Sequence, residues 1–164
     1  MDLENLLVGS AHLGVSKDLK LLSQLAGNDK PIIIVSVFYN RKNGILAAFK
    51  NKLIYATKGL LSNESFEILY SKVSSANIKN GLLLSEISVT GSGFDHEFNN
   101  IDKEGAKFFI TKLNALIDEN NSSKQTASKE DAFEKLKKLS ELKNLGIISD
   151  EEYETQRKKF LGEL

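Results

Sequence analysis

Two histidines, His12 and His96, are the first candidates for catalytic chemistry, because a neutral imidazole can act as a general base near neutral pH. His12 lies in a loop bounded by glycines, and no partner for it stands nearby in the sequence. His96 alternates with Phe94 and Phe98, so the three side chains share one face of an expected strand. We therefore interpret His96 as a histidine at the edge of the core with a backbone hydrogen-bond partner, rather than as a base.

Acidic and glycine-rich segments offer two further candidates, a metal site and a phosphate or nucleophile loop. Asp95 and Glu97 share the opposite face of the same strand and could bind a divalent ion with Asp102, but no loop with calcium-binding spacing surrounds them. The Gly-Ser-Gly segment at 91–93 has no following Lys-Ser/Thr pair and precedes a strand, which predicts a hairpin turn. The absence of cysteine excludes disulfides, thiolate catalysis and zinc–sulfur sites. We expect no catalytic residue, no metal site and no cofactor, and hence a protein that is not an enzyme.

Basic residues in and near consecutive expected hairpins form the remaining candidate site, which would bind an anion or a charged partner. These residues are Arg41, Lys42, Lys50, Lys52 and Lys58. The chain carries 22 basic and 22 acidic residues, so its net charge draws it toward neither nucleic acid nor anionic membrane. Nucleic acid is disfavoured further because surface aromatic residues do not interleave with the cations. Solvated loop charges and an anion-binding site remain the two interpretations.

The composition is typical of a soluble protein: of the 164 residues, 41% are hydrophobic and 27% are charged. No apolar run approaches the ~18 residues of a transmembrane helix. The first ten residues, MDLENLLVGS, carry two acids and no base, unlike a signal peptide. We therefore expect a cytoplasmic protein.

Short apolar segments separated by turn residues predict seven β-strands. They span residues 31–39, 45–49, 53–59, 66–69, 74–78, 83–90 and 94–98. Asn43-Gly44 is expected to supply the positive φ angles of the first hairpin turn. So many short strands joined by tight turns predict an antiparallel barrel or sandwich, and with the flanking helices an α+β fold.

One helix is expected on each side of the strands. Ser16 is a candidate N-cap for a short helix through Ala26, which Gly27 would end. After the last strand, Asp102 can cap an amphipathic helix whose apolar face would cover the end of the sheet. That face comprises Ala106, Phe109, Ile110, Leu113, Leu116 and Ile117.

Seven strands followed by one helix is the element order of the pleckstrin-homology (PH) superfold, and three segments resemble bacterial PH domains. They are the basic turn at 50–52, the Leu-Ile-Tyr strand at 53–55 and the Tyr-x-x-Val step at 70–75. The resemblance implies a PH-like binding domain. In eukaryotic PH domains basic residues around the first hairpin hold phosphoinositide headgroups, but the full basic spacing of those lipid binders is absent here.

A polar segment at 120–130 without aromatic residues is expected to form a flexible linker to a C-terminal helical hairpin. Gly146 would end the first helix, and Ser149 with Glu152 forms a capping box for the second. The apolar residues of the hairpin are Phe133, Leu136, Leu139, Leu142, Leu145, Ile147, Ile148, Tyr153, Phe160 and Leu161. Two short helices bury too little apolar surface to fold alone, so we expect the hairpin to dock on its own domain, on a second copy or on another protein.

The hairpin resembles the SHOCT module, a short bacterial C-terminal domain. The Leu-Gly-Ile-Ile-Ser segment at 145–149, the Glu-Glu-Tyr at 151–153 and the basic, apolar end at 158–161 carry the resemblance. It implies a module for oligomerisation or partner binding. We thus divide the chain into an N-terminal helical segment (1–28), a PH-like β domain with its capping helix (29–119), the linker (120–130) and the hairpin (131–164).

These observations lead to one main functional hypothesis and two alternatives. The main hypothesis is a non-catalytic, cytoplasmic interaction protein of bacterial or phage type, whose hairpin binds a second copy or another protein. Peripheral binding to anionic membrane through Arg41, Lys42, Lys50 and Lys52 is the first alternative. A nucleic-acid-associated accessory protein is the second.

Overall fold

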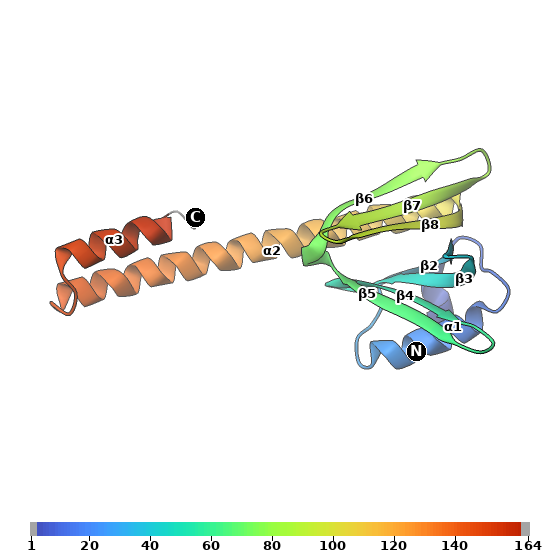
Figure 1. Ribbon diagram of the computed structural model, residues 1–164, viewed down its shortest axis with the longest axis horizontal. Coiled ribbons are helices and arrows are strands. Elements are labelled where there is room, and N and C mark those ends of the chain that lie inside the picture. Colours follow the sequence, from blue (N-terminus) through green and yellow to red (C-terminus); the bar gives the residue numbers. More distant parts are fainter. Residues whose placement is uncertain (1–2, 162–164) are drawn as a thin grey trace. The chain divides into compact units, whose positions relative to one another are not determined.

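The computed structural model describes the backbone of residues 3–161, and the side chains of these residues except 123–133 and Phe160. The chain forms two compact units, Met1–Asn120 and Asn121–Leu164 (Figure 1). The first unit holds the sheet and the start of the long helix α2 (Lys103–Asn144), and the second holds the rest of α2 and the last helix.

The first unit is built on an antiparallel sheet in the order β5-β4-β3-β2-β8-β7-β6. Its strands are β2 (Ile33–Tyr39), β3 (Lys42–Ala48), β4 (Lys52–Lys58), β5 (Asn63–Leu69), β6 (Val73–Asn80), β7 (Leu84–Gly91) and β8 (Phe94–Asp102). A single residue pair, Phe38 with Asn99, joins β2 to β8. The predicted antiparallel α+β fold with a helix after the sheet is confirmed.

Two 3-10 helices and a two-residue strand accompany these strands. A 3-10 helix, η1 (Leu3–Leu6), leads into β1 (Leu7–Val8), which pairs in parallel with β2. A second 3-10 helix, η2 (Tyr70–Lys72), separates β5 from β6. These segments are too short to show a period of their own.

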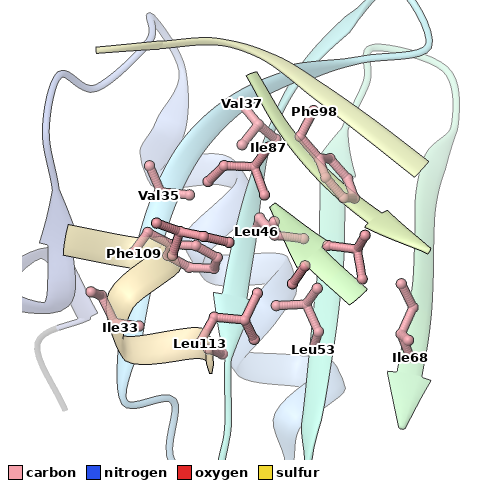
Figure 2. Close-up of a cluster of buried hydrophobic side chains, with 14 of the residues drawn as sticks. Ile33, Val35, Val37, Leu46, Leu53, Ile68, Ile87, Phe98, Phe109 and Leu113 are labelled. Carbon is pink, nitrogen blue, oxygen red and sulfur yellow. The ribbon is translucent and has the colours of Figure 1, made fainter. Parts of the chain in front are cut away.

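Strands β2, β3 and β4 are buried on both faces, which explains their nearly continuous apolar sequences. On the inner face, residues such as Val35, Leu46 and Leu53 pack with Ile87 and Phe98 of the other strands, as Figure 2 shows. On the outer face, the second core cluster combines residues of these strands with residues of α1 (Val15–Ala26).

Helix α1 begins two residues before the expected position and lacks the expected cap. Gly14, at a left-handed φ of 93°, occupies the N-cap position without a side-chain hydrogen bond, so the prediction of Ser16 as the cap was wrong. The helix ends at Ala26 with Gly27 as its C-cap, as predicted. A positive φ at Gly14 costs little because glycine has no Cβ.

The first hairpin turn lies within the segment predicted for it, 40–44, but its positive φ angles occur three residues earlier than predicted. Asn40 and Arg41 have φ angles of 48° and 64°, and Tyr39 pairs with Lys42 on the two sides of the turn. Gly44 instead lies within β3, where an added Cβ would meet the Tyr55 ring at 2.8 Å. The glycine is therefore required by close packing and not by turn geometry.

Helix α2 (Lys103–Asn144) begins at the predicted cap. The Oδ1 of Asp102 accepts a hydrogen bond from the Gly105 N–H at 2.8 Å, and its Oδ2 accepts one from the Ser10 N–H at 2.7 Å. The predicted apolar face from Ala106 to Ile117 is buried, and Phe109 and Leu113 lie within the core cluster in Figure 2.

The backbone at 120–130 differs from expectation, because α2 runs through the segment where we expected an irregular linker. No proline or glycine occurs between residues 106 and 144, so no residue there interrupts a helix. The side chains at 123–133 lie outside the described residues. The domain limits at 119 and 131 stay a prediction.

In the second unit, the C-terminal part of α2 and the helix α3 (Asp150–Leu161) form the predicted hairpin. Gly146, at a φ of 69°, donates its N–H to the Lys143 carbonyl at 2.9 Å, which ends α2. The Ser149 N–H donates to the Glu152 carboxylate at 2.9 Å, and the Glu152 N–H donates to the Ser149 Oγ at 3.2 Å. The capping box is therefore confirmed.

Candidate interaction surfaces

A buried polar network connects the N-terminal loop, α1 and the sheet. The Nε2 of His12 lies 2.8 Å from Oδ2 of Asp18, and its Nδ1 shares a hydrogen bond with the Oγ of Ser36 on β2. The other Asp18 oxygen, Oδ1, accepts a hydrogen bond from the Lys58 N–H at 2.5 Å. Asp18 is 3% exposed and Ser36 is 6% exposed. The network ties the loop before α1 to β2 and to the end of β4.

This network combines serine, histidine and aspartate, but its geometry is that of an anchor. The Ser36 hydroxyl accepts from the His12 backbone N–H at 3.2 Å in addition to its bond with the imidazole. Ser36 lies within strand β2, where it is enclosed by the loop that it holds. A nucleophile must be open to its substrate, so the arrangement is better suited to fixing the loop than to acyl transfer.

The five predicted basic residues divide between the two ends of the sheet. Arg41 and Lys42 follow the end of β2, and Lys58 ends β4, so these three lie at one end of the antiparallel strands. Lys50 lies between β3 and β4 and Lys52 begins β4, so both are at the opposite end. The structure therefore does not bring the five residues together into one patch.

Two of these lysines are also engaged in ion pairs. Lys42 Nζ lies 2.6 Å from the Glu64 carboxylate. Lys52 Nζ lies 3.0 Å from Asp29 and 3.1 Å from Glu67, and these hydrogen bonds raise the pKa of Lys52 above its ordinary value. The half-buried Lys52 thus neutralises nearby carboxylates and is a poor candidate for binding an external anion.

A hollow of about 490 Å³ opens at the end of the sheet that holds Lys42 and Lys58. Three leucines that line it are almost fully exposed: Leu13 at 100%, Leu60 at 98% and Leu61 at 97%. Three lysines line the same hollow, namely Lys17, Lys42 and Lys58. We call these six residues the leucine–lysine rim. Sequence reasoning missed its leucines, although two of them follow Gly59 in a turn, where apolar side chains have little to pack against.

His96 lies at the edge of the core, as predicted, but its partner is a side chain. Its ring stacks on Phe66 with centroids 4.5 Å apart and on Phe94 at 5.5 Å. The Tyr39 hydroxyl shares a hydrogen bond with His96 Nδ1 at 2.8 Å, so the expected backbone partner was wrong. Burial among these rings lowers the pKa of His96, because the charged imidazolium is poorly solvated there.

The acidic residues considered as a metal site have other roles or are solvated. Asp95 and Glu97 are exposed, and Asp102 caps α2. Within the described part of the chain, no three His, Asp or Glu side chains are grouped closely enough to hold a metal ion.

The hairpin buries little of its apolar surface. Leu139 is 8% exposed, whereas Leu136, Ile148 and Tyr153 are half-buried. The side chains of Phe133 and Phe160 lie outside the described residues. Among the apolar hairpin residues whose side chains are described, four are exposed by more than a third: Leu142 at 38%, Leu145 at 72%, Ile147 at 64% and Leu161 at 46%. We call these four the exposed hairpin face.

Two family models match the chain, and the first covers more than half of it. The model described as the bacterial PH domain matches residues 25–115. The chain belongs to this family. Its PH domain thus contains β2–β8 and the buried start of α2, while the Short C-terminal domain model (SHOCT) matches residues 134–161 in the hairpin. The predicted PH and SHOCT domains are both confirmed.

Comparison with individual proteins adds little to the family assignment. A crystal structure of the C-terminal domain of an unknown protein from Leishmania infantum is similar with a TM-score of 0.44 and 14% identity, over 60% of this chain and 92% of that chain. No curated protein matches the sequence. Among the described residues, no helix is both long and apolar enough to cross a membrane.

Proposed function

We propose that this PH-domain protein is a non-catalytic interaction protein of bacterial or phage type that acts in the cytoplasm and self-associates through its SHOCT hairpin. The observation that carries the proposal is the exposed hairpin face. Leu145 and Ile147 lie on either side of Gly146, where the chain turns between the two helices, and both are more than 60% exposed. Large apolar side chains gathered at one turn favour burial against another surface.

A second copy of the hairpin is a suitable partner because it carries the same apolar residues. Burying a leucine or isoleucine side chain contributes about 1.5–3 kcal/mol, so a few such residues on each copy give a weak but real association. Each association event would place two PH domains in one assembly. Their weak binding sites would then act together, and avidity would raise the apparent affinity for a shared target.

Sedimentation of the full chain over a range of concentrations tests this proposal. We expect wild type to form oligomers, and Leu145→Glu combined with Ile147→Glu to sediment as a monomer, because a buried unpaired charge opposes association. Leu60→Glu combined with Leu61→Glu is the matched control, since it makes the same chemical change on the PH domain. Wild type that stays monomeric at high micromolar concentration overturns self-association and leaves docking to another protein as the role of the hairpin.

A second candidate function is peripheral binding to anionic membrane, and the leucine–lysine rim favours it. Leu13, Leu60 and Leu61 could insert among lipid chains, while the rim lysines meet anionic headgroups at about 1 kcal/mol per cation. This surface differs from the one expected from sequence, because Lys50 and Lys52 lie at the other end of the sheet. Such binding would be weak and sensitive to salt.

Vesicle flotation distinguishes this candidate from the first. We expect the full chain to float with vesicles that contain phosphatidylglycerol and not with phosphatidylcholine vesicles, and the L60E/L61E variant to stay in solution. The L145E/I147E variant is now the control, because it leaves the rim unchanged. Equal flotation with both kinds of vesicle, or none, eliminates the electrostatic mechanism.

A further inference from the structure

Strand β6 forms one edge of the sheet. Among the described strands it pairs with β7 alone, and Figure 1 shows its other side facing away from the sheet. Alternate residues of an edge strand direct their N–H and C=O groups outward, where a further extended chain can pair with them. The eight residues of β6 give this edge the length of an ordinary strand pairing.

The two edge strands of the sheet differ in charge. The other edge, β5, carries Glu64 and Glu67, which form ion pairs with Lys42 of β3 and Lys52 of β4. Strand β6, with the sequence VSSANIKN, has no acidic residue. Its one cation, Lys79, is 82% exposed at the side chain and lies 4.0 Å from Glu86, which is a loose ion pair.

A hollow of about 470 Å³ lies between the end of β6 and the first turns of α2. It is lined by Ile78 and Asn80 of β6 and by Lys103 and Lys107 of α2. The two lysines are one helical turn apart and exposed, and neither forms a salt bridge within the described residues. No carboxylate is among the described residues that line the hollow.

The floor of this hollow is apolar and already ordered. Ile78 is half-buried and packs against the main core cluster. Asn80 is held by the Ser85 hydroxyl, which donates to its Oδ1 at 2.8 Å. A ligand at this position would meet a preformed apolar contact beside two free cations, and a preformed site reduces the entropic cost of binding.

We propose that an extended, acidic peptide segment of a partner protein adds to β6 as a further strand. Its backbone would pair with the open edge, one apolar side chain would lie on Ile78, and a carboxylate would lie between Lys103 and Lys107. An extended segment is required because only such a chain can pair along an edge strand. Acidic character follows from the cations Lys79, Lys103 and Lys107. The surface is separate from the exposed hairpin face and from the leucine–lysine rim, so this inference goes beyond the function proposed above.

NMR titration of the isotope-labelled full chain with three synthetic peptides tests the proposal. The first peptide carries valine and glutamate in turn on one face of the extended chain, with threonine at the intervening positions. The second has lysine in place of glutamate, and the third is the acidic peptide with alternate backbone nitrogens methylated. We expect the acidic peptide to shift the amide resonances of β6 and of Lys103–Lys107 and to slow hydrogen exchange along β6. The basic peptide should bind at least about tenfold more weakly. The methylated peptide should also lose binding, because it keeps its charge but cannot form the strand hydrogen bonds.

Charge-reversal variants locate the site. Lys103→Glu combined with Lys107→Glu should weaken binding of the acidic peptide about tenfold or more. Lys20→Glu combined with Lys30→Glu, at two exposed positions outside both surfaces, changes the net charge equally and should leave the affinity unchanged. Circular dichroism checks that each variant is folded.

Four results would overturn the proposal. They are the absence of shifts at β6 with the acidic peptide, equal binding of the methylated peptide, equal losses in the two double variants, and β6 shifts that depend on protein concentration without peptide. The last result would mean that β6 pairs with a second copy. None of them bears on the hairpin, whose self-association is measured separately.

Discussion

The Nε2 of His12 lies 2.8 Å from Oδ2 of Asp18, and this contact fixes the loop before α1 against the sheet. Asp18 also accepts the Lys58 N–H, so one buried carboxylate joins the loop, the helix and the end of β4. Leu13 and Lys17 of the leucine–lysine rim lie between these two anchor residues in the sequence. The orientation of the rim therefore depends on a polar network that the sequence pattern does not reveal.

Loss of this anchor should destabilise the PH domain. Asp18→Ala leaves His12 and the Lys58 N–H without their buried acceptor, and we expect a loss of about 2–3 kcal/mol in the free energy of unfolding. Urea denaturation followed by circular dichroism measures it. Asp118→Ala, at an exposed position of α2, is the control and should change stability by less than about 0.5 kcal/mol. Equal effects of the two substitutions would show that the network contributes nothing specific.

Acidification should weaken the fold through His96. Burial among Phe66, Phe94 and Tyr39 lowers the pKa of His96 below its ordinary value of 6.5, so the unfolded chain binds this proton more readily than the folded chain. The stability that His96 contributes is therefore fully present above pH 6.5 and is lost as the pH falls through the lower, folded-state pKa. The nearby Asp95 opposes the shift but does not reverse it.

The free energy of unfolding of wild type and of His96→Phe, measured between about pH 7 and pH 5, checks this prediction. The phenylalanine variant keeps an aromatic ring but cannot titrate, so its stability should fall less steeply with acidification. His12 is present in both proteins, and its contribution cancels in the comparison. Parallel pH profiles for the two proteins would contradict the assignment.

Gly44 on β3 should not tolerate substitution, because the ring of Tyr55 on β4 packs closely against it. Gly44→Ala places a Cβ 2.8 Å from the Tyr55 ring and 2.9 Å from the Ala56 carbonyl, and neither group can move without disturbing the core. We expect a loss of about 1–3 kcal/mol in the free energy of unfolding. Asn43→Ala at the adjacent exposed position is the control. A Gly44→Ala variant as stable as wild type would show that the packing at this point is loose.

The elements that could be predicted from the sequence are those specified by neighbouring residues. The capping box of Ser149 with Glu152 and the cap at Asp102 each act over three residues, so their patterns are visible in the sequence. The succession of strands along the PH domain follows from apolar segments and turns in the same way. The shift of the first turn to Asn40-Arg41 was missed because Gly44 is a glycine for a tertiary reason.

The candidate surfaces could be predicted only in part, because tertiary contacts assemble them. His12 and Ser36 are 24 residues apart, and no local pattern relates them. Lys42 and Lys52 belong to consecutive strands but lie at opposite ends of the sheet and pair with different carboxylates. Leu13 lines the same hollow as Leu60 and Leu61 because α1 covers the outer face of the sheet, which the sequence did not indicate.

Self-association through the hairpin is the central claim, and spin labels on the hairpin test it most directly. The chain has no cysteine, so a single introduced cysteine gives one defined label site. Lys158→Cys, at an exposed position of α3, places a spin label on the hairpin, and Ser62→Cys places one on the PH domain as a comparison. We expect dipolar coupling between Lys158→Cys labels on different copies that grows with protein concentration and disappears in the L145E/I147E background. Absence of coupling at any concentration, or coupling that survives those two substitutions, would contradict the account.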